Sequence, residues 1–115
     1  MLNYRGTFYS REHLWLSPNT NPDFWDFSFE EFGKYDLKAA IEYIQKVKQS
    51  IDKISIIGFS EGTTTSFYAL SDEPEYFESK IDLFIALAPT IYFKHMKHEK
   101  LRNLVSFTPI FDILD

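Results

Sequence analysis

The stretch Gly58-Phe59-Ser60-Glu61-Gly62 decides the fold of this chain, together with the apolar run Ile54-Ser55-Ile56-Ile57 directly before it. It has the form G-x-S-x-G and is followed by a helix-compatible segment, residues 63–70. This context predicts a sharp strand-to-helix turn that exposes a serine hydroxyl. The two glycines are expected to let the strained turn form and to let strand and helix approach closely. Ser60 then lies at a helix N-terminus, where the macrodipole favours developing negative charge. The alternative is a plain small-residue turn between a buried strand and a helix.

The rest of the chain alternates between helix and strand patterns. Ser28-Phe29-Glu30-Glu31 has the spacing of a capping box for a short helix, and Asp36 is expected to cap a second helix over residues 37–48. The apolar stripe predicted to bury that second helix consists of Leu37, Ala40, Ile41, Ile44 and Val47. Strands are expected at residues 53–57 and 81–87, loops at residues 19–23 and 72–75, and a mixed, mainly helical and basic segment at residues 93–105.

Such alternation predicts an α/β fold with a parallel sheet and crossover helices. Residues 81–87 are apolar on both faces, which is typical of a central strand that helices cover on both sides. Two such strands cannot cover each other's edges. We expect the chain alone to be marginally stable or insoluble.

Composition excludes several classes of function. The chain has 115 residues, a net charge of −5 and no basic patch interleaved with aromatic residues, which argues against nucleic-acid binding and against attraction to an anionic membrane. It has no cysteine, so neither disulfides nor thiolate metal sites are possible. No apolar run is long enough for a membrane span, and residues 1–6 lack the apolar core of a signal peptide.

Four segments resemble the acid lipase family, which includes the gastric and lysosomal lipases. Ile57-Gly58-Phe59-Ser60-Glu61-Gly62-Thr63-Thr64 is similar to its V-G-H-S-Q-G-T-T, and Asn3-Tyr4-Arg5-Gly6-Thr7 to its N-x-R-G-N/T. Phe24-Trp25-Asp26-Phe27-Ser28-Phe29 with Lys34-Tyr35-Asp36-Leu37 resembles F-W-x-F-S-F…K-Y-D-L, and Ala86-Leu87-Ala88-Pro89 matches A-L-A-P. The matches run in order from residue 3 to about residue 104.

The resemblance implies that residues 1–115 are a partial α/β-hydrolase domain, the middle of a sheet whose outer strands are missing. It places the start of the cap region at about residues 92–115. It makes Ser60 the nucleophile, the Glu61 backbone N–H one oxyanion donor, and Gly58 and Gly62 the glycines of the nucleophile elbow. The second oxyanion donor is expected before this chain, and the acid and histidine of the triad beyond its end. The implied substrate is a triacylglycerol or steryl ester, with no cofactor and no metal. The family is secreted or lysosomal.

Two residues depart from the family pattern. Phe59 stands where the family has histidine, and Glu61 where it has glutamine. A carboxylate at position 61 adds like charge near a developing oxyanion, so we expect it to lower activity without harming folding.

Local substitutes for the missing triad residues are weak. His95 and His98 follow the second strand and so emerge at the same sheet edge as Ser60, which allows a Ser–His dyad. Of the acids between Ser60 and these histidines, all except Glu61 are expected at the opposite edge: Asp72, Glu73, Glu75, Glu78 and Asp82. His95, His98 and Glu99 form H-x-x-H-E, which matches no catalytic zinc spacing. His13 is interpreted as structural or solvent-facing.

An aromatic cluster admits two interpretations. Its members are Phe24, Trp25, Phe27, Phe29 and Phe32. They form either a structural cluster at the entry to the helices, which is the favoured interpretation, or a patch for transient contact with a lipid interface.

Three functions remain open at this point. The first is part of a serine ester hydrolase. The second is a non-catalytic lipase remnant that binds a lipid or a partner chain through its open sheet edges. The third is another acyl-transfer activity on the same scaffold.

Overall fold

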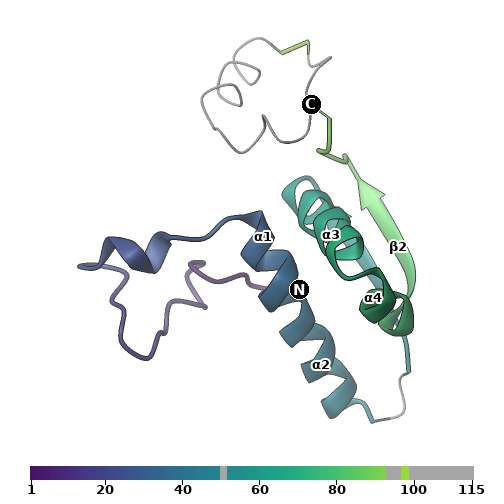
Figure 1. The fold of residues 1–115 in the computed structure, drawn as a ribbon, viewed down its shortest axis with the longest axis horizontal. Helices are drawn as coiled ribbons and strands as arrows, with labels where there is room; N and C mark the ends of the chain where they lie inside the picture. Colours follow the sequence, from purple (N-terminus) through teal and green to yellow (C-terminus); the bar gives the residue numbers. More distant parts are fainter. Residues whose placement is uncertain (50–51, 93–96, 99–115) are drawn as a thin grey trace.

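A parallel two-stranded sheet lies at one side of the molecule, with helices packed on one of its faces. The computed structural model describes residues 1–49, 52–92 and 97–98. In chain order the elements are η1 (Pro22–Trp25), α1 (Phe29–Glu31), η2 (Phe32–Leu37), α2 (Lys38–Val47), β1 (Ile54–Phe59), α3 (Glu61–Asp72), α4 (Pro74–Lys80) and β2 (Ile81–Leu87). The two strands are parallel, as predicted, with Phe59 paired to Leu87. Figure 1 shows α3 and α4 between the sheet and the helix formed by α1 and α2.

The two predicted N-terminal helices are one continuous helix, because α1 passes into α2 through the π-helical segment η2. The capping box is confirmed: Ser28 Oγ accepts from the Glu30 N–H at 3.2 Å, and the Ser28 N–H donates to Glu31 Oε2 at 2.7 Å. The prediction that Asp36 caps a second helix is wrong. Asp36 lies inside the continuous helix, and its carboxylate accepts hydrogen bonds of 2.7–2.9 Å from the backbone N–H and guanidinium of Arg5.

A glycine within η2 allows α3 to cross this helix closely. A Cβ atom on Gly33 would lie 2.9 Å from Tyr68 Cδ1 and 3.0 Å from the Thr65 carbonyl oxygen. Both distances are shorter than normal van der Waals contact, so any larger residue would push the two helices apart. The close crossing positions α3, and therefore the turn that precedes it.

The hydrophobic core lies between the helices and one face of the sheet. Its buried members are Leu37, Ile41, Ala69 and Phe77, and residues of both strands, including Ile56, pack against them. The predicted stripe on α2 is therefore right at Leu37 and Ile41. It is wrong at the C-terminal end, where Ile44 and Val47 are 39% and 57% exposed. The reason is that α2 runs on past α4, so nothing described covers its last turn (Figure 1).

The predicted loop at residues 72–75 is mostly helical. The helix α3 continues to Asp72 and α4 begins at Pro74, which leaves only Glu73 between them. Proline is tolerated in a first helical turn because its missing N–H would have had no partner there. Glu73 is fixed by Lys38, whose Nζ donates to its carboxylate at 2.5 Å.

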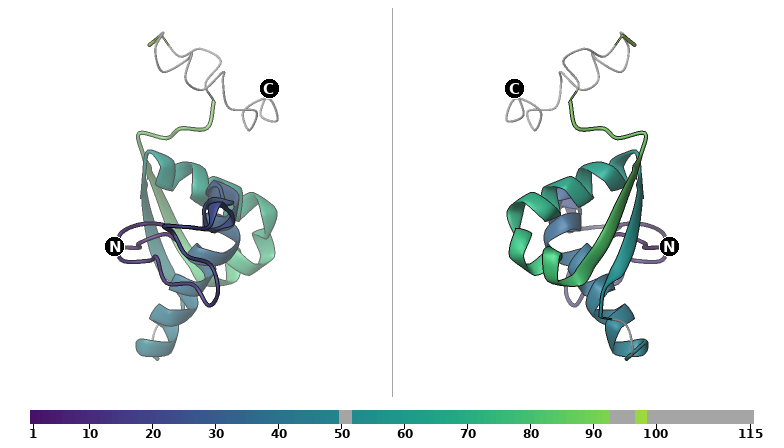
Figure 2. Two further views of the ribbon diagram at one scale, coloured as in Figure 1. Left: turned by 90° about the vertical axis from the view of Figure 1, so that its left-hand side faces the viewer. Right: turned by 90° about the vertical axis from the view of Figure 1, so that its right-hand side faces the viewer.

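The expectation that helices cover both faces of the sheet is wrong for the described residues. Figure 2 shows the helices on one side of the strands. On the other side, which we call the bare face, five apolar side chains are 39–70% exposed. They are Ile57, Phe59, Leu83, Ile85 and Leu87. Crossover connections place the helices that join two parallel strands on a single side, which accounts for the asymmetry.

Two further predictions, a helical segment at residues 93–105 and the lack of a membrane span, can be compared with the structure only within the described residues. The helical segment predicted at residues 93–105 lies outside the described residues, apart from residues 97–98. Within the described ranges, no helix combines the length and the apolar composition that crossing a bilayer requires.

Candidate active site

Ser60 lies at the junction of β1 and α3, and its backbone is strained. Its φ is 51° and its ψ is −116°. Positive φ is uncommon for a residue with a side chain and costs about 1–3 kcal/mol unless neighbouring contacts enforce it. Two hydrogen bonds do so here: the Ser60 N–H donates to the Leu87 carbonyl at 3.0 Å, and the Thr63 N–H donates to the Ser60 carbonyl at 2.8 Å. This is the sharp strand-to-helix turn that the sequence predicts.

The two glycines of the turn differ in what their missing side chains allow. A Cβ atom on Gly58 would lie 2.8 Å from the carbonyl oxygen of Gly62 and 3.1 Å from the Phe84 ring, so glycine is needed for the strand to approach the helix. A Cβ atom on Gly62 would meet no atom within 4 Å. The close-approach reason given for both glycines therefore holds for Gly58 and is wrong for Gly62.

The N-terminus of α3 places free backbone N–H groups and one carboxylate next to Ser60. Glu61 is the first residue of this helix, so its backbone N–H is among the donors that have no acceptor within the helix. Its side chain is exposed. Burial raises the pKa of the Tyr4 phenol, the Thr65 hydroxyl partly offsets this, and the carboxylates of Glu61 and Asp36 raise it further. The charge of Glu61 thus acts on the Tyr4 phenol.

Three threonines connect the turn to the segment after β2, a feature that the motif reasoning missed. Thr63 Oγ1 donates to the Ser60 carbonyl at 2.5 Å and accepts from the Thr90 N–H at 3.1 Å. Thr64 Oγ1 donates to the Thr90 carbonyl at 2.5 Å. The two threonines after the glycine of the motif were the only signal in the sequence that pointed to these contacts.

The acids after α3 lie far from Ser60 along the sheet, as predicted. Asp82, at the start of β2, accepts a hydrogen bond of 2.9 Å from Ser55 Oγ near the start of β1, whereas Ser60 follows the end of β1. Glu73 is engaged by Lys38. No group of three potential metal ligands comes together within residues 1–49, 52–92 and 97–98.

The three histidines differ in their surroundings and in whether the described residues include them. His13 is structural: its Nδ1 accepts from the backbone N–H groups of Trp15 and Leu16, at 3.3 and 3.0 Å, and so closes a turn. His95 and Glu99 lie outside the described residues, and His98 is exposed. A Ser60–His95 or Ser60–His98 dyad stays a hypothesis.

The aromatic cluster is mainly structural. Phe24 is 8% exposed, its ring centroid lies 4.9 Å from that of Trp25, and a chain of ring contacts continues through Phe27 to Phe32. Tyr4 then stacks on Phe32 with the centroids 4.6 Å apart. These contacts favour the structural interpretation over a lipid-contact patch, although Trp25 is 44% exposed.

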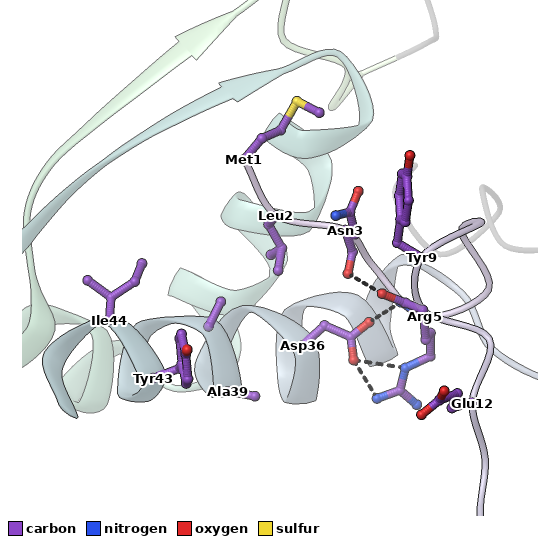
Figure 3. A pocket seen from close by; sticks show the side chains of 12 residues that line it. Met1, Leu2, Asn3, Arg5, Tyr9, Glu12, Asp36, Ala39, Tyr43 and Ile44 are labelled. Atoms are coloured by element: carbon purple, nitrogen blue, oxygen red, sulfur yellow. Dashed lines mark hydrogen bonds and ion pairs between the residues drawn. The ribbon is translucent and has the colours of Figure 1, made fainter. Parts of the chain in front are cut away.

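An open hollow of about 710 Å³ lies away from the turn, between the N-terminal segment and α2 (Figure 3). Arg5 and Asp36 are joined by their ion pair at its wall, and Tyr43 and Ile44 line the α2 side. No residue of the G-x-S-x-G turn lines this hollow. The two charges at its wall, on Arg5 and Asp36, already satisfy each other.

A strained serine between a parallel strand and a helix N-terminus, with helices packed on the sheet, defines part of an α/β-hydrolase fold. No protein-family model matches the chain. Individual relatives do match: the chain is 40% identical to a gastric triacylglycerol lipase of Bos taurus, 44% identical to lipase member K of Homo sapiens, and 40% identical to a probable lipase of Schizosaccharomyces pombe. These matches cover 95, 81 and 93% of the chain, and the chain spans only 26, 23 and 22% of the relatives' lengths. By this similarity, the chain belongs to the acid lipase family.

Proposed function

We propose that the chain is a central part of a carboxylic-ester hydrolase of the acid lipase type, with Ser60 as its nucleophile. The observation that carries the proposal is the strained Ser60 backbone, with a φ of 51°, between a parallel strand and the N-terminus of α3. Strain of this kind persists only where neighbouring contacts maintain it, and it clusters at active sites. Family membership supports lipid esters, either triacylglycerols or steryl esters, as the substrate class.

The reaction would proceed through an acyl-Ser60 intermediate. Ser60 Oγ attacks the ester carbonyl carbon while a general base takes its proton, and the alcohol leaves with a proton from the same base. The oxyanion forms beside the N-terminus of α3, where the Glu61 N–H donates to it. Water then cleaves the acyl-Ser60 ester and releases the fatty acid. The resemblance assigns the triad acid, the histidine base and the second oxyanion donor to parts of the protein outside these residues.

The Glu61 side chain is proposed to limit the rate. Its carboxylate is exposed, so solvent screens it, but it lies next to the site where negative charge develops. Glu61→Gln removes the charge and keeps the backbone donor. We expect this change to raise the esterase rate of the complete protein, and an unchanged or lower rate would reject the charge argument.

Two finer assignments rest on the resemblance. We propose that residues 1–115 belong to one hydrolase domain and that the cap region starts at about residue 92. Most of that second segment, residues 93–96 and 99–115, lies outside the described residues. We also propose transient contact with a lipid interface, which the exposed Trp25 and Trp15 support.

The test begins with the natural gene product, isolated from its own cells and weighed intact. A species well above 13.6 kDa that contains these peptides supports a complete hydrolase. That species is then treated with a fluorophosphonate, which labels activated serines. We expect the label on Ser60, and we expect Ser60→Ala to abolish both labelling and esterase activity. Activity that persists in Ser60→Ala would show that another site is responsible.

A second candidate is a non-catalytic lipase remnant that binds a lipid or a partner chain. The bare face favours it, because Ile57, Phe59 and Leu83 are each more than half exposed. A natural product of 13.6 kDa that is soluble and shows no serine labelling would favour this candidate over the hydrolase.

A further inference from the structure

We propose that Thr63 is a positioning residue that fixes the direction of the Glu61 N–H, the donor assigned above to the oxyanion. The inference rests on the proposed function, since the direction of this donor matters only if Ser60 reacts. It depends on three observations: two strained residues at one sheet edge, a buried hydroxyl that links Ser60 to Thr90, two residues beyond the second strained residue, and the planarity of one peptide group.

Two strained backbones meet at the carboxyl edge of the sheet. Ser60 and Ala88, with φ of 51° and 48°, are the non-glycine residues of positive φ in the described ranges. Each directly follows one of the paired strands, and the Ser60 N–H donates to the carbonyl of Leu87, the neighbour of Ala88, at 3.0 Å. Neither conformation is favourable by itself, so other contacts must hold both.

The Thr63 hydroxyl contacts the Ser60 turn and the segment that follows Ala88 at the same time. Thr63 is fully buried. Its Oγ1 donates to the Ser60 carbonyl at 2.5 Å and accepts from the N–H of Thr90, two residues beyond Ala88, at 3.1 Å. A hydroxyl has a single hydrogen to donate, and this one is used on Ser60. The side chain therefore acts as a bridge between the turn and the end of β2.

Planarity carries this constraint to the oxyanion donor. The Ser60 carbonyl and the Glu61 N–H belong to the same peptide group, and in a trans peptide they point in opposite directions. No cis peptide is present in the described part of the chain. The Ser60 carbonyl accepts from both the N–H and the Oγ1 of Thr63, at 2.8 and 2.5 Å. Fixing the carbonyl in this way fixes the opposed N–H, which cannot turn away from the reacting oxygen.

Thr64 reinforces the same bridge from its other end. Its Oγ1 donates to the Thr90 carbonyl at 2.5 Å and lies 2.9 Å from Thr90 Oγ1. Thr90 is thus bound through its N–H, its carbonyl and its side chain to the first turn of α3. This makes the segment after β2 a rigid support for Thr63.

The test compares three variants of the full natural protein. Thr63→Val keeps the shape and removes the hydroxyl, and Thr63→Ser keeps the hydroxyl. Thr65→Val is the matched control, because Thr65 is equally buried on the same helix and its hydroxyl acts on the Tyr4 phenol, not on the Ser60 turn or Thr90. Each variant reacts with a fluorophosphonate: the Ser60 oxygen bonds phosphorus, fluoride leaves, and the serine proton goes to the general base. Circular dichroism checks the fold of each variant.

We expect Thr63→Val to slow this reaction about 10- to 100-fold, as partial loss of an oxyanion donor does. With an ester substrate, kcat should fall and KM should change little, since the oxyanion exists only in the transition state. Thr63→Ser should restore most of the rate, and Thr65→Val should react like the wild type. Hydrogen exchange of the Thr90 amide should be slow in the wild type and faster in Thr63→Val alone.

The outcomes separate the two proposals. If wild-type Ser60 reacts and Thr63→Val reacts equally fast, the positioning role is overturned and the proposed function stands. If wild-type Ser60 does not react at all, the proposed function fails. Fast exchange of the Thr90 amide in the wild type would overturn the bridge without any variant, so the proposal stays testable even if Thr63→Val does not fold.

Discussion

The two faces of the β1–β2 sheet both carry large apolar side chains, but one face is covered and the other is exposed. On the covered face, Ile56 and Ile81 pack against a core in which Ile41 and Phe77 are each 1% exposed. On the bare face, Phe59 is 70% exposed. Alternate residues of the same strands therefore have different neighbours, although their chemistry is the same.

An apolar strand pattern therefore indicates a tendency to be buried and does not identify which elements cover the strand. The cover on one face comes from α3 and α4, which connect the two strands, and the helix that precedes β1 packs against α3 on the far side from the sheet. Such cover is local in sequence, since connections between parallel strands place their helices on one side. Cover for a second face requires other elements, and none lies over the bare face in the described ranges.

The largest expected effect comes from a matched pair of phenylalanines, one on each side. Phe77→Ala removes a ring that is 1% exposed in the core, so we expect the free energy of unfolding to fall by about 3–5 kcal/mol. Phe59→Ala removes a ring that is 70% exposed, and we expect a change within about 0.5 kcal/mol. Urea unfolding of both variants measures the difference. Similar losses in the two variants would show that the bare face is buried in solution.

The next largest effect is expected where β1 lies against the first turn of α3, at Gly58. Gly58→Ala places a Cβ atom 2.8 Å from the Gly62 carbonyl oxygen, a backbone atom that cannot move away alone. We expect it to destabilise the chain by about 1–3 kcal/mol, as overpacking does. Gly62→Ala meets no atom within 4 Å, and in a helix it should stabilise by about 0.4–1 kcal/mol. Urea unfolding of the two variants measures this difference. Equal effects of Gly58→Ala and Gly62→Ala on the free energy of unfolding would contradict the close contact between β1 and the first turn of α3.

Signals confined to a few neighbouring residues predicted the structure well. The Ser28 capping box, the turn at Ser60 and the strand Ile81–Leu87 were all correct, because their geometry depends on adjacent residues. The identity of the nucleophile candidate also came from such a local motif. Its role in catalysis stays a prediction.

Contacts between distant segments were not predictable from the pattern. Asp36 has the composition of a helix cap, yet Arg5, 31 residues away in sequence, engages its carboxylate. The bridge from Thr63 to Thr90 spans 27 residues. Threonine after a turn has many possible partners, and only the register of β1 against β2 brings this one within reach.

The smallest expected effect concerns the capping box at the start of the helix that packs against α3. The Ser28 backbone N–H, donating to Glu31, holds the pKa of that carboxyl below its ordinary value of 4.5. A depressed pKa means that Glu31 stabilises the fold above the unfolded-state value and loses this contribution as pH falls through the lower, folded-state value. Glu31→Gln retains the capping-box acceptor and removes the titration. We expect it to cost about 0.3–1 kcal/mol at pH 7, the usual worth of an anionic side chain in a first helical turn, and almost nothing at pH 2.

Glu30→Gln supplies the control for this last comparison. It removes the same charge from the same first turn, but its side chain takes no part in the capping box. If the hydrogen bonds to Glu31 matter beyond simple charge, Glu31→Gln should flatten the pH dependence of unfolding between pH 5 and 2 more than Glu30→Gln does. Equal flattening would mean that the helix dipole alone is responsible. In that case the entry to the helix would depend on the net charge of its first turn rather than on one hydrogen-bonded carboxylate.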